Sequence, residues 1–162
     1  MRWVKALVLS STSGTLDRRG CDPSGGGKYD AWLKDAEARI KDGAARGIHP
    51  AIGAPAAERS PALHLLYRCI DDMAGIPDKE KVRAGLRRAA KRTLAELADF
   101  NVPTLLIAGG EDVVFPPFLA GAIAAALPCA QAHMMPVAGH SPYFEQAATF
   151  NALIDAFLAR QR

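Results

Sequence analysis

The chain has 162 residues and a net charge of +3, with 49% hydrophobic and 23% charged residues. That length fits one domain with a real hydrophobic core. The small basic excess is not the clustered basic face that nucleic-acid binding needs, and no apolar run approaches membrane-spanning length. The composition therefore predicts neither a nucleic-acid nor a membrane partner.

Possible metal ligands and disulfide partners are scattered along the chain: Cys21, Cys69, Cys129, His49, His64 and His133. An odd number of cysteines without a CxxC pair predicts neither a disulfide framework nor a zinc site, and the histidines lack metal-ligand spacing. The first apolar run is too short for a signal peptide. We therefore expect a cytoplasmic protein without a metal or other cofactor.

The first third of the chain is predicted to contain one strand and one helix. The apolar run Val4 to Leu9 predicts a buried strand, which a loop rich in serine and glycine closes. Trp32, Ala36 and Ile40 recur four residues apart and predict a helix over residues 29–45, with a glycine near its end.

The middle of the chain is predicted to be irregular at residues 47–57 and helical thereafter. Ser60 is predicted to cap a helix that has proline at its first position, and Gly75 is predicted to end that helix. Asp78 is predicted to cap a longer helix that reaches about Ala98. The many basic residues of this second helix predict a solvated face.

The last third alternates between strands and helices. The unbroken apolar run Thr104 to Ala108 is typical of a parallel strand buried on both faces. A helix over residues 118–127, a strand over 132–137 and a helix over 144–160 are predicted to follow. The pattern predicts an α/β fold, with three parallel strands in all and helices beside them.

Two loops carry the strongest functional signal. Asp112 lies in the loop after the strand at Thr104, and His140 lies in the loop after the next strand. Because functional groups collect at the carboxyl ends of parallel strands, we expect the two side chains to lie within hydrogen-bonding reach. A carboxylate beside an imidazole is the acid–histidine pair of a catalytic triad. Glu111 is the alternative acid.

The Gly-x-x-Asp loop at 109–112 and the Gly-His loop at 139–140 resemble the C-terminal part of α/β-hydrolases. The resemblance implies that Asp112 is the catalytic acid and His140 the catalytic base. It further implies three segments: a first core strand and loop at residues 1–16, a helical cap-like region at 17–98, and a C-terminal core at 99–162. The fold expected is thus a partial α/β-hydrolase fold with a helical cap.

The chain departs from the family pattern at the nucleophile. It contains no Gly-x-Ser-x-Gly elbow and no His-Gly-type oxyanion loop, both of which would precede Met1. The expectation is a truncated chain in which the active site is incomplete. Ser10, Ser11 and Ser13 follow the first strand and are the alternative nucleophiles, although they lack the strained elbow.

The resemblance implies hydrolysis of an ester or a related bond by a Ser-His-Asp mechanism, on a small hydrophobic substrate. Two alternatives remain open, a non-catalytic remnant that acts as a binding module and one half of a split hydrolase. The side chains that could line a substrate pocket under the cap are Leu63, Leu66, Tyr67, Ile70 and Phe115. Because the strand at Val4 to Leu9 lacks a neighbour on one side, we also expect a homo-oligomer, in the simplest case a dimer.

Overall fold

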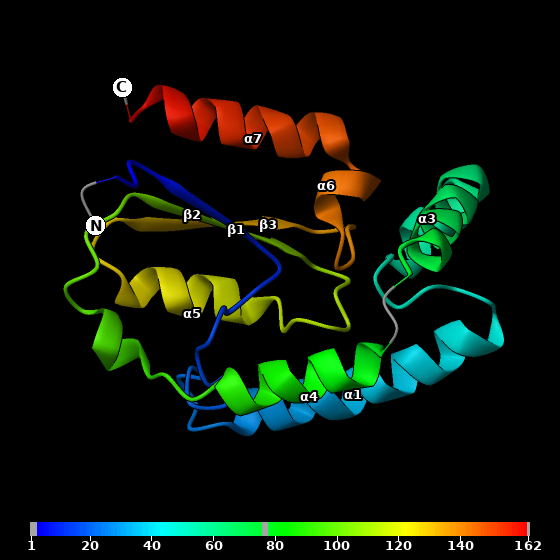
Figure 1. The fold of residues 1–162 in the computed structure, drawn as a ribbon, viewed down its shortest axis with the longest axis horizontal. Coiled ribbons are helices and arrows are strands. Elements are labelled where there is room, and N and C mark those ends of the chain that lie inside the picture. Colours follow the sequence, from blue (N-terminus) through cyan, green and yellow to red (C-terminus); the bar gives the residue numbers. More distant parts are fainter. Residues whose placement is uncertain (1–2, 76–77, 162) are drawn as a thin grey trace.

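Three parallel strands form one sheet in the computed structural model, which describes residues 3–75 and 78–161. They are β1 (Leu7–Ser10), β2 (Thr104–Gly109) and β3 (Ala130–Met135). The order across the sheet is β1-β2-β3, so β2 is central. Figure 1 shows α5 (Phe118–Ala126) against one face of the sheet, and α6 (Pro142–Glu145) with α7 (Ala147–Ala159) against the other. The predicted α/β class with three parallel strands is confirmed.

Strand β2 is buried along its whole length because its side chains alternate between two hydrophobic clusters. Leu106 and Ala108 pack on the side of α5, and Leu105 and Ile107 pack on the side of α7. Burial of each large aliphatic side chain stabilises the fold by about 1.5–3 kcal/mol. The unbroken apolar run in the sequence thus correctly predicted a parallel strand buried on both faces.

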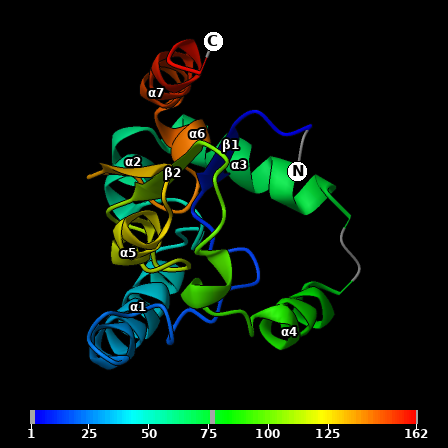
Figure 2. The same cartoon turned by 90° about the vertical axis from the view of Figure 1, so that its left-hand side faces the viewer.

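The segment between β1 and β2 is mostly helical. Its elements are α1 (Gly27–Ala45), α2 (Ala54–Arg59), α3 (Pro61–Met73), α4 (Lys79–Ala89) and the 3-10 helix η1 (Leu94–Leu97). Figure 2 shows that α4 stands apart from α1, although the two overlap in Figure 1. None of the helices in the described ranges is long and apolar enough to cross a membrane.

The local sequence patterns predicted some helix ends correctly and others wrongly. Helix α3 begins at Pro61 after Ser60 and is followed by Gly75 at a φ of +59°, as predicted, but the Ser60 side chain makes no capping hydrogen bond. Helix α1 ends through Gly47, at a φ of +69°, where Ile48 N–H bonds to the Gly43 carbonyl. This Schellman arrangement satisfies the last carbonyls of the helix. Helix α2 was not predicted, because residues 47–57 show no helical periodicity.

The prediction of one helix from Asp78 to about Ala98 is wrong at its second half. Asp78 does cap α4, with its carboxylate accepting from Lys81 N–H at 2.8 Å, but the helix ends at Ala89. Arg92 then exchanges backbone hydrogen bonds with Thr15 and Asp17, which draws the chain into an extended conformation. Because the paired residues are at least 75 positions apart, the local apolar pattern does not predict where the helix ends.

Two further boundaries differ from the predictions. Strand β3 begins at Ala130 and ends at Met135, before Pro136, which cannot donate a hydrogen bond to the neighbouring strand. The single helix predicted over residues 144–160 is two helices, separated at Gln146 with φ −141° and ψ 53°. Strand β1 also begins later than predicted, at residues 7–10 instead of 4–9. Residues 1–2, 76–77 and 162 of the predicted segments lie outside the described residues.

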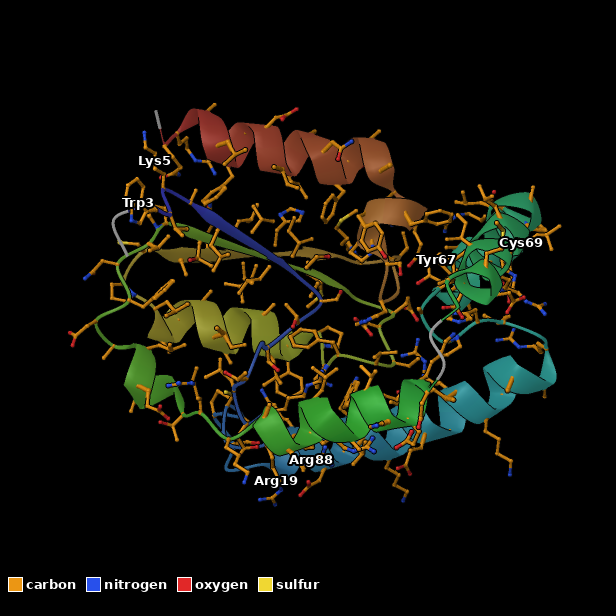
Figure 3. All side chains as sticks on the ribbon, viewed as in Figure 1. Trp3, Lys5, Arg19, Tyr67, Cys69 and Arg88 are labelled. Carbon is orange, nitrogen blue, oxygen red and sulfur yellow. The ribbon has the colours of Figure 1, made fainter. Side chains whose placement is uncertain are left out.

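Strand β1 pairs with β2 and forms one edge of the sheet. The apolar chain leading into it is exposed, with Trp3 at 95% and Val4 at 42% (Trp3 is labelled in Figure 3). Lys5 is the only charged residue among residues 3–10, and an edge that is otherwise apolar favours pairing with a second chain. We propose that self-association covers this edge, and we expect sedimentation at micromolar concentration to show a dimer.

A lysine placed at this edge is expected to oppose association because a charge there resists pairing. Val4→Lys should therefore shift the sedimentation profile toward the monomer. Val137→Lys is the matched control, since Val137 is also 42% exposed but follows β3 at the opposite side of the sheet. A monomeric parent chain, or equal effects of the two substitutions, would contradict association through β1.

Candidate active site

Asp112 and His140 meet at the carboxyl ends of β2 and β3. The Nδ1 atom of His140 lies 2.9 Å from Oδ2 of Asp112. The Asp112 side chain is fully buried, whereas 29% of the His140 side chain is exposed. The juxtaposition predicted from the two loops is confirmed, and it leaves the outer side of the imidazole ring accessible.

The turn around Asp112 holds its carboxylate in place. Oδ1 accepts hydrogen bonds from the backbone N–H groups of Val114 at 2.7 Å and Phe115 at 2.8 Å. Aspartate commonly forms such a turn with the backbone that follows it. With Oδ1 occupied by two donors, Oδ2 is the oxygen left for His140, so the carboxylate has one fixed orientation.

Arg18 braces the same turn from the loop after β1. Its Nη1 donates to the Val114 carbonyl at 2.8 Å, its Nε donates to Ser13 Oγ at 3.3 Å, and its guanidinium lies 5.7 Å from the centre of the Phe115 ring. No sequence pattern predicted a role for Arg18. A single arginine in a loop gives no signal that it will reach a turn 96 residues later.

Glu111 is excluded as the partner of His140 by its direction. Its carboxylate forms an ion pair with Arg39 of α1, whose guanidinium also donates to the Glu111 carbonyl at 3.2 Å. Adjacent side chains in this turn therefore point to different partners. The preference for Asp112 over Glu111 as the residue beside His140 is confirmed.

Glycines let three loops approach one another backbone to backbone. A Cβ atom at Gly109, at the end of β2, would lie 2.0 Å from the Gly139 carbonyl oxygen. A Cβ atom at Gly139 would in turn lie 2.2 Å from the Gly53 backbone nitrogen, at the start of α2. The loop at residues 109–112 (the acid loop), the loop at residues 139–141 (the histidine loop) and the backbone just before α2 are thus in direct contact. Each contact requires a residue without a side chain.

Glu145 of α6 joins two of these loops. Its carboxylate accepts from Gly139 N–H at 2.8 Å and from Gly53 N–H at 3.1 Å. Burial raises the pKa of Glu145, while hydrogen bonds from Gly139, Gly53 and Ser141 oppose that increase, and the nearby charge of Asp112 adds to it. No sequence pattern predicted a role for Glu145.

Helix α3 also contacts the histidine loop. Ser141 Oγ donates to Tyr67 Oη at 3.0 Å, and the Tyr67 ring packs edge-on against Phe144 with 5.1 Å between centres. Figure 3 shows Tyr67 on the side of α3 that faces α6. The helical region therefore touches the loop that carries His140 through both α2 and α3.

The three candidate serines lie at the carboxyl end of β1. Ser10 and Ser11 have buried hydroxyls without a hydrogen-bond partner among the described residues, and Ser11 has a φ of +48°. Ser13 Oγ accepts from Arg18. Within residues 3–75 and 78–161, no serine hydroxyl is hydrogen-bonded to His140.

Cys21, His49 and His64 have structural environments, whereas Cys69, Cys129 and His133 are exposed. Burial raises the pKa of the Cys21 thiol to about 11, which keeps it protonated and unreactive. His49 Nδ1 accepts from Ala51 N–H, and His64 Nε2 accepts from His49 N–H, both at 3.1 Å. In the described part of the chain, no group of three or more His, Cys, Asp or Glu side chains could hold a metal ion.

The expected substrate-pocket residues lie in different environments. Phe115 is buried in the cluster between β2 and α5, where it packs with Leu106 and Leu119. Leu66 and Ile70 of α3 are instead largely exposed. The helical spacing correctly predicted one apolar face of α3, but not whether that face packs inside the chain.

No protein-family model matches this chain, and no curated protein matches it in sequence. Among solved structures, it is similar to BpoC of Mycobacterium tuberculosis, assigned as a non-heme bromoperoxidase, with a TM-score of 0.67 and 25% identity over 98% of this chain. It is also similar to a thermophilic esterase of Thermogutta terrifontis (TM-score 0.62, 24% identity, 97% of this chain). A third similar structure is MGS-M2, an α/β-hydrolase enzyme from a Medee basin deep-sea metagenome library (0.60, 19%, 96%).

Each of these three structures matches nearly the whole of this chain, but this chain matches only part of each of them. The chain spans 59% of BpoC, 56% of the Thermogutta esterase and 56% of MGS-M2. The match therefore relates this chain to part of each larger fold.

Proposed function

Because the chain has a partial α/β-hydrolase fold, we propose that it supplies the acid and the base of a hydrolase active site whose nucleophile lies on a segment outside these 162 residues. The observation that carries the proposal is the 2.9 Å contact between His140 Nδ1 and a buried, singly oriented Asp112 carboxylate. The esterase among the structural neighbours supports an ester as the substrate class.

The proposed roles follow from the hydrogen bonds. Asp112 Oδ2 accepts the Nδ1 proton of His140, so Nε2 keeps a free lone pair. Nε2 would take the proton of a serine hydroxyl as that oxygen attacks the ester carbonyl, and would then protonate the leaving alcohol. It would next deprotonate the water that hydrolyses the acyl-enzyme, while Asp112 stabilises the imidazolium at each step.

A chimera with the Thermogutta esterase tests this proposal. In the chimera, this chain replaces the 56% of the esterase that it matches, and the rest of the esterase is kept. If Asp112 and His140 complete the triad, the nucleophile must lie in the retained part. We expect p-nitrophenyl acetate hydrolysis by the folded chimera, and a loss of at least about 10³-fold on His140→Ala. A folded chimera whose hydrolysis is unchanged by His140→Ala would overturn the proposal.

The 162-residue chain assayed by itself is expected to show no hydrolysis that depends on His140. No serine hydroxyl in the described residues is hydrogen-bonded to this histidine, so no serine is placed for the imidazole to activate. The measurement is p-nitrophenyl acetate hydrolysis by the parent chain and by His140→Ala, which should give equal rates. A burst with the parent and none with the variant would contradict this expectation and favour Ser10, Ser11 or Ser13 as the nucleophile.

A non-catalytic binding module is the second candidate function. It is favoured by apolar side chains exposed on α3 and α4: Leu65, Leu66, Ile70, Met73, Val82 and Leu86. Exposed apolar surface of this kind is typical of interaction sites. The DNA upstream of Met1 separates the alternatives. A Gly-x-Ser-x-Gly elbow in the same frame favours a longer enzyme, one in a neighbouring short gene favours a split enzyme, and its absence favours the binding module.

A further inference from the structure

The side chain of Glu145 folds back onto the loop that carries His140. Its oxygens accept from Gly139 N–H at 3.0 and 2.8 Å, and Oε1 accepts from Ser141 N–H at 3.3 Å. Gly139 and Ser141 are the residues on either side of His140 in sequence. The carboxylate therefore holds the backbone both before and after the imidazole-bearing residue.

The same carboxylate reaches the helical region. Oε2 accepts from Gly53 N–H at 3.1 Å, and Gly53 lies directly before α2. The approach is close, because a Cβ atom at Gly53 would lie 2.9 Å from Gly139 N and 3.2 Å from Glu145 Oε2. One side chain thus binds backbone donors of two segments that are more than 80 residues apart.

Glu145 has no cationic partner among the described residues, which is unusual for a half-buried carboxylate. The backbone N–H donors replace that partner, since hydrogen bonds to the charged form compensate for lost hydration. These donors belong to Gly139, Ser141 and Gly53, so the carboxylate acts directly on the loop that carries His140.

We propose that Glu145 is a positioning residue for His140. It fixes the loop at residues 139–141 in the conformation that brings Nδ1 to Asp112, and it ties that loop to the start of α2. A movement of the helical region at α2 would therefore be transmitted to the imidazole. The functional meaning of this role rests on the proposed role of His140 as a base.

The test compares Glu145→Gln with the parent chain by NMR. Gln has the same shape, but it offers one acceptor oxygen and places an NH₂ group against backbone donors, so at least one of the N–H groups of Gly139, Ser141 and Gly53 loses its acceptor. The readout is hydrogen exchange of the His140 Nδ1–H, measured relative to the amide of Leu106 in β2. We expect exchange of the Nδ1–H to become about tenfold faster relative to Leu106, the size typical for a lost hydrogen bond to a charged group.

Asp155→Asn is the matched control because it makes the same acid-to-amide change at an exposed position of α7. It should leave the exchange ratio unchanged. Equal ratios in Glu145→Gln and the parent, with faster exchange confined to the amides of α2, would overturn the proposal and leave Glu145 as a structural brace of α2 only.

Gly53→Ala tests the same contact without altering the carboxylate, in case Glu145→Gln fails to fold. Its Cβ would displace both Gly139 N and Glu145 Oε2. Faster relative exchange of the His140 Nδ1–H in this variant supports the proposal, and an unchanged ratio contradicts it. Hydrogen exchange is measured on this chain alone and tests whether Glu145 positions His140. The esterase chimera tests separately whether His140 acts as the base, so the two proposals can fail independently.

Discussion

Asp112→Asn is expected to lower kcat for p-nitrophenyl acetate in the esterase chimera by about 10⁴-fold. The backbone N–H groups of Val114 and Phe115 require an acceptor, so the amide oxygen of the asparagine will face them. Its NH₂ group will then face His140 Nδ1 and force that atom to accept a hydrogen bond. The ring proton moves to Nε2, which is the atom that must be free to take the proton of the nucleophile.

Glu111→Gln is the control for that substitution because it makes the same change at the neighbouring residue. Glu111 pairs with Arg39 in a partly exposed ion pair, and such pairs contribute little energy. We expect its kcat to stay within about fivefold of the unsubstituted chimera. Similar losses from the two substitutions would mean that the acid loop contributes only through its overall folding.

Gly109→Ala is expected to destabilise the chain by about 3 kcal/mol or more. The added methyl group would overlap the carbonyl oxygens of Gly139 at 2.0 Å and Ala138 at 2.3 Å. These are backbone atoms of the histidine loop, which cannot rotate away as a side chain could. Relief requires the acid and histidine loops to separate, and both are anchored to strands of the sheet.

Gly121→Ala provides the matched control for this measurement. Gly121 lies inside α5, and a Cβ atom there meets nothing within 4 Å. Alanine in a helix interior should stabilise the chain by about 0.5–1 kcal/mol. Urea denaturation of both variants gives the comparison, and a loss below 1 kcal/mol for Gly109→Ala would show that the two loops are free to move apart.

The sequence predicted the sheet and the acid–histidine pair because both depend on local patterns. The apolar run at 104–108 identifies a strand buried on both faces, and a parallel sheet brings the loops after its strands to one edge. The end of α3 was likewise marked by a glycine with positive φ, Gly75. Patterns of this kind need no knowledge of distant contacts.

The features that the sequence did not reveal depend on pairings across long stretches of chain. Arg18 reaches Val114 and Glu145 reaches Gly53, and nothing near these residues in the sequence marks their partners. The break between α4 and η1 has the same origin, because Arg92 pairs with the backbone at Thr15 and Asp17. The close approach of Gly53 to Gly139 became apparent only once the loops were placed in space.

The tautomer of His140 is the most direct test of the claim that Asp112 and His140 form a catalytic acid–base pair. ¹⁵N NMR of the chain at neutral pH distinguishes a protonated ring nitrogen from an unprotonated one. We predict a proton on Nδ1, where Asp112 Oδ2 lies 2.9 Å away, and an unprotonated Nε2. Asp112→Asn should reverse the two. A proton on Nε2 in the parent chain, or a tautomer that does not respond to Asp112→Asn, would contradict the account.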